Sequence, residues 1–195
     1  MWSAAILAGG HARRFGGKDK GALVIDGRPI LERQLEEISK ITTDILMVGG
    51  RGDAAGRARL IGDRVPECGP LGGLHAALSE SQTDATFVIA CDMPFVSATL
   101  MLHLLELTRE ADAVVPRTDR GFHPLCAAYT RGCLQAIVAR LATMRLKMVD
   151  LLEDVTLRVV TTNEIEAFGD HRRLLANVNT PADYRGLEAV QGHQL

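Results

Sequence analysis

The 195-residue chain has few aromatic side chains: phenylalanine, tryptophan and tyrosine together make up 4% of it. Proteins that bind single-stranded nucleic acid stack successive bases on aromatic rings, so this composition disfavours that class. Charge of one sign is also lacking, because 22 basic residues are balanced by 24 acidic ones, for a net charge of -2. The charge of the whole molecule therefore attracts neither nucleic acid nor an anionic membrane. Any binding of phosphate must depend on a local cluster of basic groups.

The four cysteines form no CxxC pair and have no zinc-like spacing with histidine. This pattern predicts reduced, mostly buried thiols in a reducing compartment. No apolar run approaches the ~20 residues that span a membrane. The first apolar run ends at Gly9 and Gly10 and is shorter than the apolar core of a signal peptide. We therefore expect a cytoplasmic protein that is neither exported nor inserted into a membrane.

Short apolar runs alternate along the chain with stretches of helical periodicity. Strands are expected at residues 4–8, 44–48, 86–91, 113–115, 122–129 and 157–160. Helices are expected at residues 30–39, after the Gly-Pro turn near Leu71, after an N-cap at Ser97, from Leu134 onward and from Thr180 onward. Apolar runs without alternation indicate strands buried on both faces. The pattern predicts one α/β domain, residues 1–195, with a doubly wound, mainly parallel sheet and helices on both faces, as in Rossmann-like folds.

Glycines and basic side chains follow the first expected strand. Gly9 and Gly10 end that strand, and residues 11–20 then carry four basic side chains, Arg14 and Lys20 among them, and one acidic side chain. Glycine lets main-chain N–H groups converge on an anion, and the basic side chains neutralise it. A solvated basic loop is the alternative. The glycine pair directly after a buried strand favours phosphate binding.

Two common phosphate-binding motifs do not fit this loop. A P-loop requires glycine where Ala12 stands and a hydroxyl side chain where Asp19 stands. A dinucleotide-binding fingerprint requires glycine where His11 stands. Residues 50–55 do match GxGxxA after a strand, but no apolar helical stripe follows them, so a turn is expected there.

Asp92 emerges from the apolar run 86–91, and Pro94 helps to stop the strand there. In an open α/β sheet, ligands bind beyond the carboxyl ends of the strands. Magnesium that also contacts phosphates uses only one or two protein carboxylates, so one aspartate at this position is sufficient. The alternative is an aspartate that caps the turn.

Three further segments contain polar or glycine residues that could face a ligand. Asp63 precedes the glycine-rich segment 69–73, and a carboxylate can accept hydrogen bonds from the N1–H and N2–H₂ groups of guanine. Asn177 and Asn179 precede Thr180, and a simple helix entry is their alternative explanation. His123 is ambiguous by itself, because a lone histidine is more often structural than catalytic.

In this order, these segments resemble the nucleotidyltransferases that attach a nucleotide to molybdopterin, and most closely the molybdenum cofactor guanylyltransferases. The resemblance is carried by residues 7–10, 14–21, 69–73, 91–94, 123–124 and 177–181, which span nearly the whole chain. It implies the fold of the nucleotide-diphospho-sugar transferases. It also implies transfer of GMP from GTP to the terminal phosphate of molybdopterin, with Mg²⁺ as cofactor and release of pyrophosphate.

The resemblance also implies roles for individual residues. By position, Leu7, Ala8 and Gly9 contact the nucleotide and Lys20 binds its phosphates. Asp63 contacts guanosine, Asp92 binds GTP and Mg²⁺, and Asn177 and Asn179 face the pterin. In such a reaction two polyanions approach each other, and Arg14 is a further cation that can neutralise their charge. The only macromolecular contact it implies is a transient one with other proteins of molybdenum cofactor synthesis.

Three alternatives stay open at this point. A close relative could transfer CMP from CTP to molybdopterin, and a more distant one could act on a sugar 1-phosphate. A protein of another class could retain the loop as a non-catalytic GTP-binding adaptor.

Overall fold

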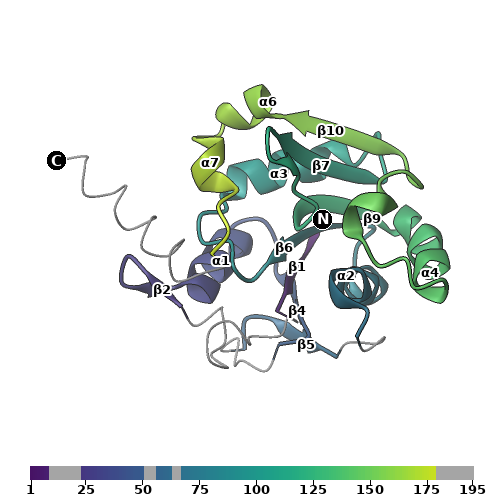
Figure 1. Ribbon diagram of the computed structural model, residues 1–195. Coiled ribbons are helices and arrows are strands. Elements are labelled where there is room, and N and C mark those ends of the chain that lie inside the picture. Colours follow the sequence, from purple (N-terminus) through teal and green to yellow (C-terminus); the bar gives the residue numbers. More distant parts are fainter. Residues whose placement is uncertain (9–22, 51–55, 63–66, 179–195) are drawn as a thin grey trace.

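The computed structural model describes residues 1–8, 23–50, 56–62 and 67–178 (Figure 1). The strands of its main sheet are β1 (Ser3–Leu7), β4 (Asp44–Val48), β5 (Arg59–Ile61), β6 (Ala85–Ala90), β7 (Ala113–Thr118), β8 (Gly121–Phe122), β9 (Cys126–Thr130) and β10 (Leu157–Thr161). A second, two-stranded sheet is formed by β2 (Val24–Ile25) and β3 (Arg28–Pro29). The helices are α1 (Ile30–Ser39), α2 (Gly69–Glu80), α3 (Ala98–Leu107), α4 (Leu134–Ala142), α5 (Met148–Leu151), α6 (Thr162–Glu166) and α7 (His171–Leu174), with a 3₁₀ turn at Arg131–Cys133.

The main sheet is mixed and mostly parallel. Its strands lie in the order β10-β7-β9-β6-β1-β4-β5, with β8 beside β7. β1 is parallel to both β4 and β6, β4 is parallel to β5, and β7 is parallel to β10. Only β8 and β9 run antiparallel to their described neighbours. The predicted doubly wound, mainly parallel α/β fold is therefore confirmed.

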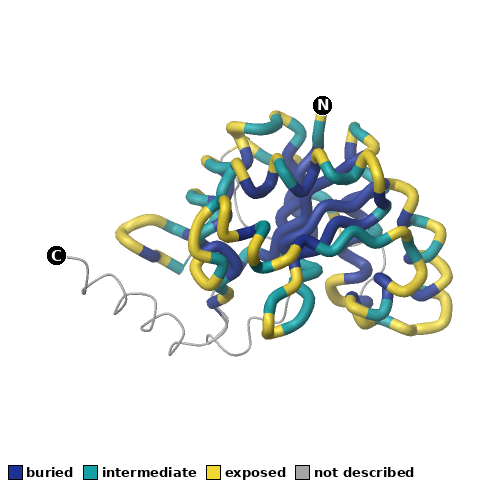
Figure 2. The backbone as a smooth tube through the Cα atoms, turned by 90° about the horizontal axis from the view of Figure 1, so that it is seen from above, coloured by how far each residue is buried: buried dark blue, intermediate teal, exposed yellow. Residues whose placement is uncertain are grey.

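The central strand β1 is buried on both faces, which explains its unbroken apolar sequence. Ala4 and Ile6 pack in one apolar cluster with residues of α1 and α3. Ala5 and Leu7 point to the opposite face and pack with residues of α2 and α4. Because successive side chains of a strand point to opposite faces, a strand between two helical layers needs apolar residues at every position. Figure 2 shows this buried centre as a dark blue core beneath exposed loops.

Several local predictions are confirmed closely. α1 occupies the predicted residues 30–39, and β4 occupies 44–48. Ser97 is the N-cap of α3, where its hydroxyl accepts a hydrogen bond from the N–H of Leu100. None of the four cysteines, all of which the structure describes, forms a disulfide, and three of them are buried. Burial raises the pKa of the Cys126 and Cys133 thiols to about 12, so these thiols stay protonated at neutral pH.

The predictions for the second half of the sheet need two corrections. The single strand expected at 122–129 is divided into β8 and β9, and a turn at residues 123–125 separates them. The strand expected at 113–115 continues to Thr118, past Pro116. Pro116 is tolerated because it falls between two partners: β9 pairs with the start of β7 and β8 pairs with its end. Proline has no N–H to donate, but the described pairings of β7 with β8 and β9 do not include Pro116, so none of them is lost.

Two expected features fall outside the described residues in whole or in part. The helix expected from Thr180 onward lies entirely outside them, as does most of the turn expected at 50–55. Among the helices that the structure does describe, none has the length and apolar character that crossing a bilayer would demand.

Candidate active site

Three parallel strands end level with one another at one edge of the sheet. Leu7, the last residue of β1, lies in register with Val48 of β4 on one side and with Ala90 of β6 on the other. Main-chain hydrogen bonds continue one residue farther: the N–H of Ala8 donates to Val48 O (2.9 Å), and that of Cys91 donates to Leu7 O (3.2 Å). The segments that follow these strands therefore start side by side, as the sheet prediction required.

Asp92 lies in the turn that follows β6, and only 8% of its surface is exposed to solvent. Its main-chain oxygen accepts a hydrogen bond from the N–H of Val178 (2.8 Å). This bond brings the end of the described chain to the acidic turn, with Asn177, an exposed residue, next in sequence. Two segments that are far apart in the sequence thus meet at the edge where ligands bind in α/β sheets.

Two glycines lie close to the strand ends at this edge, and one of them, Gly50, leaves no room for a side chain. A Cβ atom on Gly73 of α2 would lie 3.4 Å from the methyl groups of Leu7, so the helix lies directly against the end of β1. A Cβ atom on Gly50 would lie 2.7 Å from the sulfur of Met47 and 3.1 Å from the Cβ of Ala8. The first glycine belongs to the segment 69–73 that the sequence singled out. The glycine side of α2 therefore faces the same edge as Leu7 and Ala8.

The structure brings together four of the residues predicted from the sequence. Leu7, Ala8, Asp92 and Asn177 lie at the carboxyl edge of β1 and β6 or are joined to it by the Val178 bond. Gly9, Arg14, Lys20, Asp63 and Asn179 lie outside the described residues. The described chain leading to Asp63 ends at this edge too, because the N–H of Gly49 donates to the carbonyl of Ile61 at the end of β5 (3.0 Å).

His123 lies at the same edge, in the turn between β8 and β9. The carbonyl of Leu125, two residues later in that turn, accepts a hydrogen bond from the N–H of Ala90 (2.9 Å). The His123 ring is half-buried, and its Nε2 is hydrogen-bonded to the hydroxyl of Thr118 (2.9 Å). Burial lowers the pKa of His123 most, and electrostatic interactions with Arg120 and His171 lower it further. The imidazole is therefore neutral at neutral pH.

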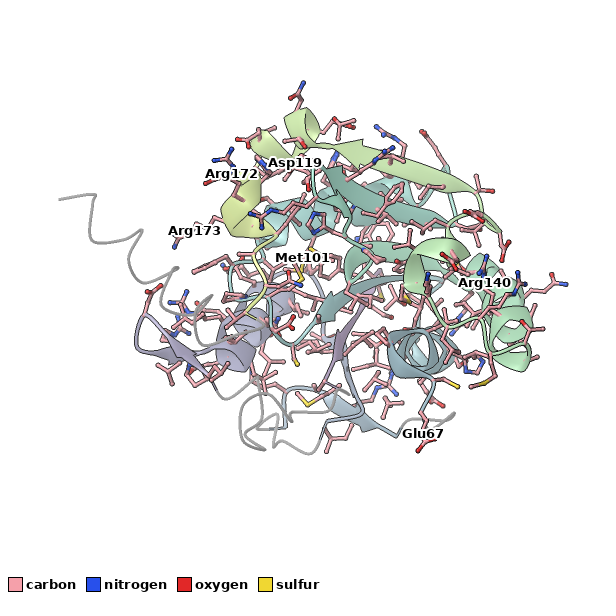
Figure 3. The ribbon with its side chains drawn as sticks, viewed as in Figure 1. Glu67, Met101, Asp119, Arg140, Arg172 and Arg173 are labelled. Atoms are coloured by element: carbon pink, nitrogen blue, oxygen red, sulfur yellow. The ribbon has the colours of Figure 1, made fainter. Side chains whose placement is uncertain are left out.

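The lowered pKa of His123 predicts a pH-dependent contribution to stability. The opposing charge of Asp119 only partly offsets the effects of burial, Arg120 and His171 on that pKa. The unfolded chain binds the proton more readily than the folded one, so the free energy of unfolding should fall as the pH drops through the ordinary value of 6.5. Figure 3 labels Asp119 in the β7–β8 turn and Arg172, which follows His171 on α7.

This prediction can be checked by urea unfolding at about pH 7.5 and about pH 5.5. The His123→Gln variant is the comparison, because glutamine stays neutral while its amide can still bind the Thr118 hydroxyl. We expect the wild type to lose more stability than the variant on acidification. Equal losses in the two proteins would show that His123 does not titrate in this way.

A group of three side chains near α7 has the composition of a metal site but has a structural explanation. Ligand atoms of Glu166, Asp170 and His171 lie within 4.8 Å of one another, and both carboxylates are exposed. Asp170 caps α7 by accepting from the N–H of Arg172 (2.9 Å). His171 is hydrogen-bonded to Glu166, which lowers the pKa of that carboxyl. These interactions account for the cluster without an ion.

One residue at the site belongs to no sequence motif and was not predicted from the sequence. Gln34 of α1 is fully buried, and its side-chain amide donates to the carbonyl of Ala90 (2.8 Å) and to that of Met93 (2.9 Å). The available signal was a polar residue within the apolar stripe of a helix, since Ile30 and Ile38 are buried one turn before and after it.

Comparison with known proteins agrees with this arrangement. Residues 4–157 match the family model described as the MobA-like NTP transferase domain. This match covers well over half of the chain and includes the strands that form the site edge, β1, β4 and β6. The chain belongs to this family.

Two curated relatives align over almost the entire chain. A probable molybdenum cofactor guanylyltransferase from Pelotomaculum thermopropionicum is 32% identical, over 91% of this chain and 87% of that protein. A molybdenum cofactor guanylyltransferase from Desulfosudis oleivorans is 30% identical, over 95% of this chain and 93% of that protein. The family resemblance seen in the motifs is therefore confirmed.

Solved structures place the fold. Molybdopterin-guanine dinucleotide biosynthesis protein A from Archaeoglobus fulgidus superposes with a TM-score of 0.82 and 26% identity, over 98% of this chain and 99% of that one. The 4-diphosphocytidyl-2C-methyl-D-erythritol synthase from Anaerococcus prevotii superposes with a TM-score of 0.72 at 18% identity, over 98% and 96%, which shows a common fold alone. The MobA-like chain thus has the predicted fold of the nucleotide-diphospho-sugar transferases.

Proposed function

We propose that this protein is a molybdenum cofactor guanylyltransferase, which transfers GMP from GTP to the terminal phosphate of molybdopterin and releases pyrophosphate. The names of its relatives give the reaction. The observation in the structure that carries the proposal is the common edge of β1 and β6. There, Leu7 and Ala8 of the proposed nucleotide loop start beside the turn that holds Asp92.

The proposed reaction is a single in-line displacement. An oxygen of the molybdopterin phosphate forms a bond to the α-phosphorus of GTP, and the bond from that phosphorus to the bridging oxygen of pyrophosphate breaks. The attacking phosphate is largely ionised at neutral pH, so no general base has to remove a proton from it. Catalysis then consists mainly of bringing two polyanions together in line and neutralising their charge.

Asp92 fits the role of a magnesium ligand. Its carboxylate offers the oxygen atoms that Mg²⁺ prefers, and the turn places it where phosphates reach the carboxyl ends of the strands. When bound, Mg²⁺ would supply positive charge to the phosphate oxygens. The fold of the turn fixes the Asp92 main chain from two sides, through Cys91 N–H on Leu7 O and Val178 N–H on Asp92 O. Hydrogen bonds to β1 and to Val178 thus hold the main chain of the turn that carries the proposed ligand.

The other residues of the resemblance complete the proposal. Leu7, Ala8 and Gly9 contact the nucleotide through the main chain, Arg14 and Lys20 neutralise the triphosphate, Asp63 accepts from guanine, and Asn177 and Asn179 contact the pterin side. Support for the pterin side comes from the Val178 bond, which brings Asn177 to the acidic turn. We further propose that residues 1–195 act as one nucleotidyltransferase domain in the cytoplasm, with transient contacts to other proteins of cofactor synthesis.

The decisive experiment mixes the purified protein with molybdopterin, Mg²⁺ and each nucleoside triphosphate separately. We expect the mass of the guanine dinucleotide product and one equivalent of pyrophosphate with GTP, and little product with CTP. A sugar 1-phosphate in place of molybdopterin tests whether the protein is a sugar-1-phosphate nucleotidyltransferase instead.

Each other result points to a different function. Equal use of CTP would favour a cytidylyltransferase, and product from the sugar phosphate alone would favour a sugar-nucleotide enzyme. Tight GTP binding without release of pyrophosphate would indicate the non-catalytic adaptor. Asp63→Asn tests the choice of base, and we expect it to weaken the preference for GTP over CTP. Cytosine lacks the N1–H and N2–H₂ donors from which this carboxylate would accept hydrogen bonds in guanine.

A further inference from the structure

Gln34 occupies a position that helical periodicity reserves for an apolar side chain. It lies on α1 between Ile30 and Ile38, and none of its surface is exposed to solvent. A polar side chain is costly in the apolar interior unless hydrogen bonds satisfy it. The bonds that Gln34 forms therefore show what this side chain does.

The two amide hydrogens of Gln34 span the acidic turn. Nε2 donates to the carbonyl of Ala90 (2.8 Å), the last residue of β6, and to the carbonyl of Met93 (2.9 Å), directly after Asp92. Both partners are carbonyl oxygens, which only accept, so the orientation of the amide is fixed by chemistry. The N–H of Met93 also donates to Ala90 O (3.3 Å) and closes the same turn. Gln34 thus holds both ends of the two-residue segment Cys91–Asp92.

The other half of this amide contributes no described hydrogen bond. Gln34 Oε1 is buried, and no residue within the described ranges donates to it. A buried acceptor without a partner opposes folding, and an apolar side chain would avoid that penalty, but it would also leave the carbonyls of Ala90 and Met93 without the hydrogen bonds from Gln34. The effect of Gln34 on the free energy of unfolding is therefore the difference between these two terms. In addition, its two donated bonds hold the carbonyls that flank Cys91 and Asp92.

We infer that Gln34 is a positioning residue, which sets the direction of the Asp92 carboxylate by holding the carbonyls on either side of it. This inference rests on the proposed function, since it takes Asp92 as the residue that binds Mg²⁺ and GTP. Val178 N–H holds the Asp92 carbonyl itself, so three main-chain oxygens of the turn have fixed partners. Gln34 lies on α1 beneath this turn and acts on substrate through Asp92.

The test replaces Gln34 with methionine, which has a similar length and no N–H donor. We expect kcat for GMP transfer to fall by ~10- to 100-fold and the half-saturating Mg²⁺ concentration to rise by a similar factor, as for other residues that orient metal ligands. KM for GTP should stay near its wild-type value, because the proposed nucleotide contacts of Leu7, Ala8 and Gly9 do not depend on Gln34. A second readout needs no turnover: Mn²⁺ binding, followed by electron paramagnetic resonance with a non-hydrolysable GTP analogue, should weaken in parallel.

Thr86→Val is the matched control. Thr86 is buried near the start of β6, the strand whose other end leads into the Asp92 turn. Its hydroxyl donates to Ser81 Oγ (2.8 Å). Its loss removes a buried hydrogen bond as Gln34→Met does, but far along the strand from Asp92. We expect both variants to shift the unfolding midpoint, and only Gln34→Met to change the Mg²⁺ dependence and Mn²⁺ binding.

The outcomes separate the two proposals. A wild-type protein without guanylyltransferase activity defeats the proposed function. An active wild type with unchanged Mg²⁺ dependence and Mn²⁺ binding in Gln34→Met defeats only the inference about Gln34. If that variant does not fold, Gln34→Asn retains the amide on a shorter side chain and should show an intermediate effect. Failure of both variants to fold would assign Gln34 to stability and would also overturn the inference.

Discussion

Replacing Asp92 with asparagine is expected to lower kcat for GMP transfer by ~100-fold or more, since the loss of one preorganised electrostatic contact at a transition state commonly has this effect. Asparagine has almost the same shape but carries no charge, so it binds Mg²⁺ poorly. The fold should remain intact, because the described contact between this turn and the end of the chain uses the Asp92 carbonyl and the Val178 N–H, which the substitution retains.

The measurement is steady-state pyrophosphate release, together with a thermal unfolding curve for each protein. Asp84→Asn is the matched control, because Asp84 is an exposed aspartate directly before β6, at the opposite end of the same strand. We expect wild-type turnover from the control. Near-normal product formation by Asp92→Asn would exclude Asp92 as the metal-binding residue.

Replacing Lys20 with methionine is expected to have the second large effect, again of ~100-fold on kcat/KM. Lys20 lies outside the described residues, and its role comes from the motif in which it stands. If Lys20 and Asp92 act on the same triphosphate, their losses are not independent. The double variant should then be less impaired than the product of the two single effects, because groups that act as a unit give strongly non-additive losses.

This coupling is measured as kcat/KM for GTP across the wild type, both single variants and the double variant. Lys147→Met with Asp92→Asn is the control cycle, because Lys147 is an exposed residue directly before α5 and belongs to none of the segments at the site edge. In that control cycle we expect the two effects to be independent, so that the loss of kcat/KM in the double variant equals the product of the two single losses. Multiplicative losses for Lys20 and Asp92 would mean that the basic loop and the acidic turn serve different ligands.

How much of the fold could be predicted depended on how local each signal was. The bounds of α1 follow from an apolar stripe within one helix, and β1 from an unbroken apolar run. β5, by contrast, has three residues that are exposed or half-exposed, and it is a strand because it pairs with the end of β4. The stretch 122–129 has the composition of one strand, but its two ends pair with different partners on either side of a turn.

The candidate site shows the same division. Asp92 and the glycine-rich loop were recognised because each combines a chemical group with a position directly after a strand. Gln34 was not, because an isolated glutamine in a helix has no motif, and its role depends on the two carbonyls that tertiary packing brings to it. His123 was ambiguous for the same reason, since its hydrogen bond to Thr118 and its lowered pKa come from neighbours in the folded turn.

By itself, the sequence determined the class of fold, most of the strands and helices, and the chemical groups available for nucleotide transfer, because apolar periodicity and motif spacing are properties of short segments. Only the tertiary structure decided that Leu7, Val48 and Ala90 end level with one another, and that Val178 and Gln34 both reach the Asp92 turn. The hydrophobic pattern of a strand sets its register only where the pattern alternates, and β1 is buried at every position. Its register, and the hydrogen bonds between distant segments, therefore depend on the packing of both helical layers on the sheet.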